Sequence, residues 1–196
     1  MVTPPYAPSA RWWSIFLKGL TSDGLSAADA MAAANRVAGI SGKGYARCAV
    51  TGNSGMASLS VAIEGGSHAL SRHGREHTAA ISLHGNWPHA HLGALEAAYG
   101  RAPYYIHLMP RLRDILQSPP PTLRELNVEV YKCISDFLGI KGRRLPLTEA
   151  AAERGDEIAA EIDPELSILD AAMRLGPETV LGLLRMDTDN ECMRGE

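Results

Sequence analysis

Histidine is the residue type whose pattern in this chain comes closest to a catalytic motif. Six of the seven histidines lie between His68 and His91, and residues 73–77 have the sequence HGREH, the HxxEH string of one class of metalloproteases. That chemistry needs both histidines on one face of a stable helix. Gly74 disfavours such a helix by about 1 kcal/mol, and a strand is expected just after Thr78. We therefore interpret residues 73–77 as a solvated loop and expect no metal site.

His91 is the histidine that periodicity places on an inward helix face. Trp87, His91, Leu95 and Tyr99 recur every four residues within a helix expected over residues 87–99, so they share one side of it. Because imidazole titrates near neutral pH, an inward His91 could act as a general base in a cleft. The alternative is a core histidine that is hydrogen-bonded to the backbone. The sequence leaves both interpretations open.

Two β-prone runs precede this helix and are expected to form a hairpin. They are residues 45–51 and 57–63, and the turn between them, from Gly52 to Gly55, contains residues that accept the positive φ of a tight turn. A third strand is expected over residues 79–83, although alanine is a weak strand former.

Helices are expected where a capping residue precedes an apolar repeat. Asn86 is expected to cap the helix over 87–99, and Thr122 with Glu125 has the capping-box spacing for the strongest helix, over 123–138. Further helices are expected over residues 9–20, 26–37 and 163–175, with a short last helix after Pro177. These elements predict a single domain of α/β or α+β class, in which five or six helices pack a small mixed β-sheet made of the N-terminal arm, the hairpin and the third strand.

Length and composition exclude several classes of function. The chain of 196 residues has the size of one domain, which we place at residues 1–186, followed by a polar, disordered tail over 187–196. Lys and Arg total 19 against 22 Asp and Glu, so no broad basic field favours nucleic acid, which is not an expected partner. Three cysteines without a CxxC pair predict neither a disulfide framework nor a zinc knuckle and fit a cytoplasmic location.

The sequence indicates neither a membrane segment nor a cofactor motif. No run reaches transmembrane length, and the prolines of the first eight residues interrupt any signal peptide. Residues 11–20 could lie on a membrane surface, but we favour an ordinary core helix there. A Gly-x-Ser-x-Gly elbow and a dinucleotide fingerprint are both missing, so we expect no cofactor.

Several ordered segments resemble one family of bacterial proteins. The main ones are HGNWPHAHLGALEAAYGRAPYY, from His84 to Tyr105, and LRELNVEVYKCISDFLGI, from Leu123 to Ile140. The segments PPYAP, RCAVTGNSGMASLSVAI and LSILDAAMRLGPE agree in order. Together they resemble the WbqC-like family. The matching positions are Pro4, Tyr6, Arg47, Gly52, Asn53, Gly55, Asn86, Trp87, His91, Glu96, Tyr99, Pro103, Asn127, Leu138, Gly139, Ser167, Asp170, Gly176 and Pro177.

The chain departs from the family pattern over Leu25 to Gly44, where an acidic, aromatic strand would be expected, and before Leu166, where a Tyr- and Phe-containing stretch is missing. The family is associated with bacterial surface polysaccharide (O-antigen) gene clusters, and a glycine-transferring role has been suggested for it. The resemblance thus implies a context more firmly than a mechanism.

The resemblance leads us to expect an acyl- or aminoacyltransferase of the glycine type, acting on a sugar or sugar nucleotide in surface polysaccharide synthesis. His91 would deprotonate the sugar amine or hydroxyl, Asn86 and Asn127 would orient the substrate, and Arg47 would hold a phosphate or carboxylate. The further candidate binding residues are aromatic: Tyr6, Trp87 and Tyr99. The alternative is a non-catalytic binding or scaffolding protein of the same pathway. The two differ in whether His91, Asn86 and Arg47 converge on one reacting atom.

Overall fold

The structure is a computed structural model that describes residues 2–21, 23–52, 55–70, 78–140 and 162–184. In chain order its elements are α1 (Ala10–Thr21), α2 (Ala27–Val37), the 3-10 helix η1 (Gly42–Ala46), β1 (Arg47–Gly52), β2 (Gly55–Ser60), the 3-10 helix η2 (Gly66–Leu70), α3 (Trp87–Tyr99), α4 (Tyr105–Gln117), α5 (Leu123–Phe137) and α8 (Ile168–Leu175). Residues 177–184 are helical as well. The expected tail over 187–196 and the HGREH string lie outside the described residues.

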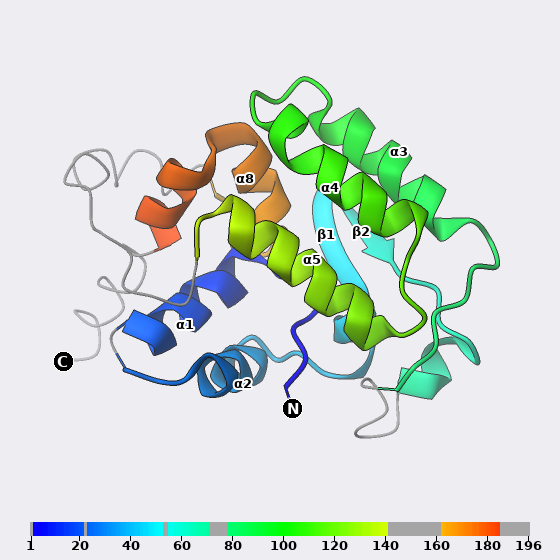
Figure 1. The fold of residues 1–196 in the computed structure, drawn as a ribbon, viewed down its shortest axis with the longest axis horizontal. Coiled ribbons are helices and arrows are strands. Elements are labelled where there is room, and N and C mark those ends of the chain that lie inside the picture. Colours follow the sequence, from blue (N-terminus) through cyan, green and yellow to red (C-terminus); the bar gives the residue numbers. More distant parts are fainter. Residues whose placement is uncertain (1, 22, 53–54, 71–77, 141–161, 185–196) are drawn as a thin grey trace.

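The chain forms a mixed α/β domain, as predicted, in which helices surround a small hairpin (Figure 1). Helix α3 packs against α4 and against β1, α4 packs against α5, and α1 packs against α2. In the view of Figure 1, α5 crosses the centre, while α3 and α4 lie together above the hairpin. Helices from distant parts of the sequence therefore pack against β1, whereas most residues of β2 are exposed.

The predicted hairpin is confirmed, but the sheet is smaller than predicted. Within the described residues it has two antiparallel strands, paired from Arg47 with Ser60 to Gly52 with Gly55. The third predicted strand contributes only isolated bridges, including one between Ile63 and Ile81. The arm over residues 2–8 is no strand, because its prolines have no N–H with which to join a ladder. The sheet is therefore a hairpin and not a mixed sheet.

A side-chain cap marks the start of α5 but not that of α3. Thr122 and Glu125 form both halves of a capping box at the start of α5, as predicted. Asn86 precedes α3 in the left-handed conformation, with φ of 50°, and its side chain makes no capping hydrogen bond. The prediction of a side-chain cap at Asn86 is therefore wrong, although the bounds of α3 are as predicted.

Helix α8 begins later than predicted, at Ile168, with Ser167 as its cap. Part of the preceding segment supplies carbonyl groups to another helix: Pro164 O accepts from the backbone N–H of Arg11 at 3.1 Å, and Leu166 O from that of Ala10 at 3.0 Å. These bonds satisfy free N–H groups at the start of α1 and hold the segment outside a helix.

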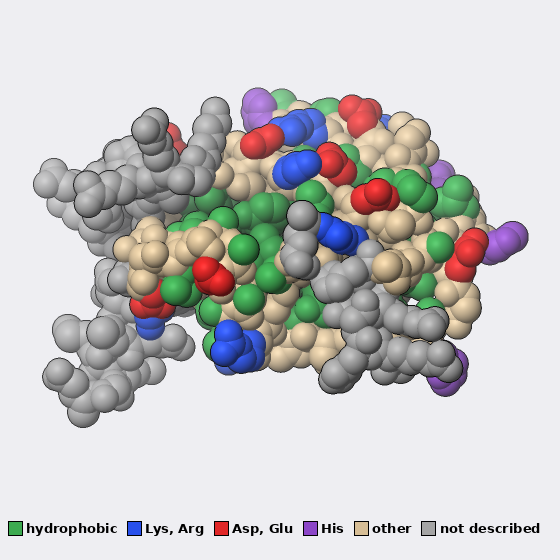
Figure 2. Space-filling view, turned by 60° about the horizontal axis from the view of Figure 1, so that its bottom comes forward, with side chains coloured by type: hydrophobic (Ala, Val, Ile, Leu, Met, Phe, Trp, Pro, Cys, Tyr) green, Lys and Arg blue, Asp and Glu red, His purple; other side chains and the backbone are tan. Residues whose placement is uncertain are grey.

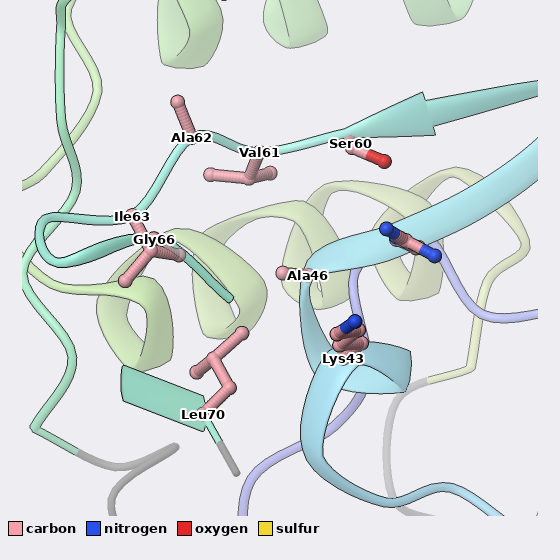
Figure 3. A pocket seen from close by; sticks show the side chains of 9 residues that line it. Lys43, Ala46, Ser60, Val61, Ala62, Ile63, Gly66 and Leu70 are labelled. Carbon is pink, nitrogen blue, oxygen red and sulfur yellow. The ribbon is translucent and has the colours of Figure 1, made fainter. Parts of the chain in front are cut away.

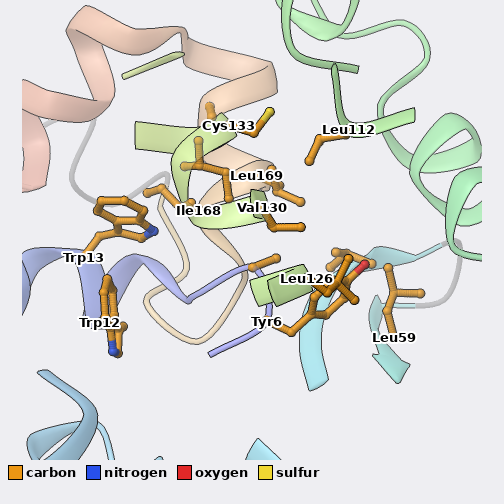
Figure 4. Close-up of a cluster of buried hydrophobic side chains, with 14 of the residues drawn as sticks. Tyr6, Trp12, Trp13, Leu59, Leu112, Leu126, Val130, Cys133, Ile168 and Leu169 are labelled. Carbon is orange, nitrogen blue, oxygen red and sulfur yellow. The ribbon is translucent and has the colours of Figure 1, made fainter. Parts of the chain in front are cut away.

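An aromatic cluster fixes α1 in the core. The ring of Trp13 stacks on that of Tyr131 with centroids 5.2 Å apart, and Trp12 stacks on Phe16 at the same centroid distance of 5.2 Å. Trp12 and Trp13 are fully buried. Figure 4 shows Trp13 beside apolar side chains from α5 and α8, whereas Trp12 points toward α2 and donates to Asn35 Oδ1 at 2.8 Å. The interpretation of residues 11–20 as a core helix is therefore confirmed. In the described part of the chain, no helix combines the length and apolar character needed to cross a membrane.

Candidate functional site

His91 lies in the interior with both ring nitrogens engaged. Its Nε2 is 3.1 Å from the backbone oxygen of Ser60, and its Nδ1 is 3.0 Å from the hydroxyl of Tyr6. A carbonyl oxygen can only accept, so Nε2 carries the hydrogen and Nδ1 accepts the Tyr6 O–H. The side chain is only 3% exposed. Neither nitrogen is left free to take a proton from a substrate.

The electrostatics of this position keep His91 neutral. Burial lowers its pKa to about 4, and the hydrogen bond to Ser60 opposes this effect only in part. At neutral pH the ring is therefore uncharged. The geometry corresponds to the interpretation of His91 as a core histidine, bonded to the backbone.

Trp87 and Asn86 lie at the start of α3 but point into different surroundings. Trp87 is buried, donates from Nε1 to Ser82 O at 2.8 Å, and packs edge-on against the ring of His91 at 4.9 Å. Asn86 is exposed. These two neighbours therefore form no common wall of a cleft.

Asn127 braces the N-terminal arm from α5. Its Nδ2 donates to Pro4 O at 2.9 Å and to Tyr45 O at 2.8 Å, and the same Tyr45 oxygen accepts from the Tyr6 N–H at 3.2 Å. The Oδ1 of Asn127 is buried without a hydrogen-bond partner among the described residues. This side chain therefore orients protein carbonyls, whereas the transferase scheme expects it to orient a substrate.

Tyr99 belongs to a separate cluster, the Asp170 brace, defined by Thr51, Tyr99, Asp170 and Arg174. The Tyr99 hydroxyl accepts from the Thr51 N–H at 3.1 Å, while the Thr51 hydroxyl donates to the Asp170 carboxylate at 2.6 Å. Arg174 Nε donates to the other carboxylate oxygen at 3.0 Å. Burial raises the pKa of Tyr99, so this phenol stays protonated at neutral pH.

Arg47, in contrast, lines a pocket of about 220 Å³. The Lys43–Arg47 pocket, as we name it, is lined by Lys43, Ala46, Arg47, Ser60, Val61, Ala62, Ile63, Gly66 and Leu70. Figure 3 shows Lys43 and Ala46 on one side, with Val61 and Ala62 across from them and Leu70 entering from η2. The pocket therefore has two walls. One is formed by η1 and the start of β1, and the other by the end of β2, the residues after it and η2.

The pocket combines positive charge with an apolar lining. Elsewhere cations are often neutralised: Figure 2 shows acidic and basic side chains interspersed over one face, and Arg111 donates to Asp136 at 2.9 Å. Lys43 and Arg47 are exposed, and no carboxylate of the described residues lies within ion-pair distance of either. Two such cations beside apolar side chains suit an anion that carries a less polar group.

The seven predicted site residues therefore fall into separate groups. Tyr6, Trp87 and His91 meet in the interior, and Asn127 of α5 bonds the N-terminal arm that carries Tyr6, whereas Tyr99 joins the Asp170 brace. Of the three residues that catalysis would require together, only Arg47 lines the pocket; His91 and Asn86 do not. Among the described residues, no group of three or more His, Cys, Asp or Glu side chains could hold a metal ion.

Sequence reasoning missed Lys43, the second cation of the pocket. It lies in the Gly-rich stretch between the helix expected over residues 26–37 and the hairpin, where the sequence predicts no helix or strand. The usable signal was the spacing of Lys43 and Arg47, four residues apart at the start of a strand.

The comparisons with known proteins give the family. The model of the WbqC-like protein family matches residues 23–163. The chain belongs to this family. The matched range covers well over half of this WbqC-like chain and includes every residue that lines the pocket, whereas Tyr6 and Asp170 lie outside it. Searches of curated proteins and of solved structures found no match.

Proposed function

We propose that this WbqC-like protein binds an anionic small molecule in the Lys43–Arg47 pocket, and that the ligand is a sugar nucleotide or a related sugar derivative of bacterial surface polysaccharide synthesis. In this proposal it acts in the cytoplasm as a binding protein of that pathway. The pathway comes from the family resemblance, and the chemical class comes from the pocket.

The observation that carries the proposal is the pair of cations without carboxylate partners in the described part, beside apolar walls. Arginine recognises phosphate through paired N–H groups, and lysine adds a mobile point charge. Val61, Ile63 and Leu70 offer apolar surface against which the rings of a sugar nucleotide can pack. A neutral sugar would leave both charges without a partner.

An acyl- or aminoacyltransferase is the second candidate, and one observation favours it. Ser60 lines the pocket and brings a hydroxyl close to where an anionic donor would bind. Deprotonation would need a general base, and the described lining contains neither imidazole nor carboxylate. This is why we put the binding role first.

Isothermal titration calorimetry with UDP-glucose and with pyrophosphate tests the proposal. Binding should weaken by about tenfold or more in Arg47→Ala, because a charge-assisted hydrogen bond contributes about 1.5 to 3 kcal/mol. Arg36→Ala, which removes an exposed cation of α2 outside the pocket, is the matched control and should bind as the wild type does. Equal binding by both variants would contradict the proposal. Incubation with a glycyl donor and the sugar nucleotide, followed by mass spectrometry, detects transfer if the second candidate is correct.

A further inference from the structure

The two walls of the Lys43–Arg47 pocket are joined through the hairpin ladder, in which Arg47 pairs with Ser60. The N–H of Val61 donates to the carbonyl oxygen of Ala46 at 2.8 Å, which continues the hairpin ladder by one bond. Beyond it the walls continue into η1 and η2, which also contact each other. The relative placement of the cations and the apolar side chains also depends on the groups outside the ladder that hold η1 and the end of β2.

Tyr6 connects both walls from behind. Its backbone N–H donates to Tyr45 O at 3.2 Å, and Tyr45 stands between Lys43 and Arg47 in the chain. Its hydroxyl lies 3.0 Å from Nδ1 of His91, whose Nε2 is 3.1 Å from the carbonyl of Ser60 on the other wall.

This chain of hydrogen bonds is rigid because water does not compete for it. Tyr6 is 4% exposed and His91 is 3% exposed. Burial raises the pKa of Tyr6 well above its ordinary value, so the phenol remains a donor at neutral pH. Figure 4 shows Tyr6 between Leu126 of α5 and Leu59 of β2, which limits its movement.

We infer that Tyr6 and His91 are positioning residues for the pocket: Tyr6 holds Tyr45 O, and with His91 it holds Ser60 O, which sets the two walls at the spacing that binds the anion. This inference rests on the proposed function. It gives the N-terminal arm a role in ligand affinity, although no residue of the arm lines the pocket. Residues that fix the groups around a site determine how well the site is preorganised.

Tyr6→Phe is the direct test, because it removes only the hydroxyl that bonds His91. The affinity of the folded protein for UDP-glucose or pyrophosphate should fall about fivefold, within the range seen for residues that act without touching a ligand. Thr51→Val is the matched control. It also deletes a hydrogen-bonded hydroxyl, but this hydroxyl joins β1 to Asp170 outside the pocket. Its affinity should stay within about twofold of the wild type. Both variants are titrated well below their unfolding temperatures.

A second pair of variants separates positioning from mere stability. His91→Gln keeps an amide donor and a carbonyl acceptor, whereas His91→Leu keeps neither, so glutamine should restore most of the affinity that leucine loses. Hydrogen exchange at the Val61 amide supplies a readout without ligand, and exchange there should be faster in Tyr6→Phe than in Thr51→Val.

The outcomes distinguish this inference from the proposed function. If the wild type binds in an Arg47-dependent manner and Tyr6→Phe binds equally well, the positioning role is wrong and the proposed function stands. If no Arg47-dependent binding occurs, the proposed function fails and the positioning role fails with it. Weaker binding by Tyr6→Phe, with an unchanged Thr51→Val, supports both.

Discussion

At the scale of single residues, His91 shows how a titratable side chain can serve a fold without chemistry. Its ring links Tyr6 on the N-terminal arm to the Ser60 carbonyl on β2, and Trp87 covers it edge-on. A charged imidazolium in this position would lose its hydration. Among the described residues, no carboxylate forms an ion pair with His91 that could compensate for this loss. The neutral ring is therefore the form that the fold stabilises.

The stability of the protein should depend on pH through His91. Its pKa is lowered from 6.5 to about 4 by burial, so the unfolded chain takes up the proton first as the pH falls. The contribution of neutral His91 to the free energy of unfolding is fully present above pH 6.5. It declines between pH 6.5 and 4 and changes no further below pH 4. Between pH 7 and 4.5 this group should cost about 2 to 3 kcal/mol of unfolding free energy.

Urea unfolding of the wild type and of His91→Gln at both pH values measures this cost. The variant has no imidazole at this position, whereas the carboxylates that titrate in the same range are common to both proteins. The wild type should therefore lose about 2 to 3 kcal/mol more than the variant on acidification. An equal loss in the two proteins would show that His91 has an ordinary pKa in the folded state.

At the scale of elements, the hairpin is held near both ends. His91 of α3 bonds the carbonyl of Ser60 at the end of β2, and the Asp170 brace holds Thr51 beside the turn. Asp170 is 2% exposed and accepts from both Thr51 and Arg174. A buried carboxylate whose oxygens are both bonded fixes α8 against β1 and makes this end of the hairpin rigid.

Asp170→Asn should destabilise the protein by about 2 to 3 kcal/mol, because an amide cannot accept on both terminal atoms and has no charge for Arg174. Asp163→Asn is the control. Asp163 is exposed and accepts the Glu165 N–H through one oxygen, which an amide can also do, so this change should stay within about 0.5 kcal/mol. Chemical denaturation measures the free energy of unfolding of both variants. Equal values for the two would show that the Asp170 brace does not stabilise the fold.

Local patterns predicted some elements well and others poorly. The bounds of α3 and the capping box of α5 followed from residues close in sequence. Helix α4 was not predicted: Pro110 lies inside it, where proline disfavours a helix, yet the helix is continuous and its apolar face is buried by α3 and α5. The predicted third strand does not form a ladder, because Ile81 bridges to Ile63 and Ala80 bridges to Thr122 in a different segment. Tertiary packing, and not local propensity, decides this outcome.

At the scale of the whole molecule, the site depends on contacts that no local pattern contains. Periodicity correctly predicts that His91 points inward, and Arg47, which the family resemblance selects, lines the pocket. That Leu70 and Val61 face Lys43 follows from the hairpin register and from the path of the chain after it. The separation of Asn86 from Arg47 likewise depends on how α3 packs, so the expected convergence could not be judged from the sequence.

The central claim is that the Lys43–Arg47 pocket binds an anion, and an NMR titration with UDP-glucose tests it most directly. In ¹⁵N-labelled protein, the amides of Ala46, Val61 and Gly66 should shift in a saturable manner, because all three residues line the pocket. In Arg47→Ala the same shifts should need about ten times more ligand. Shifts confined to the exposed start of α3 around Asn86, or no saturable shifts at millimolar ligand, would contradict the claim.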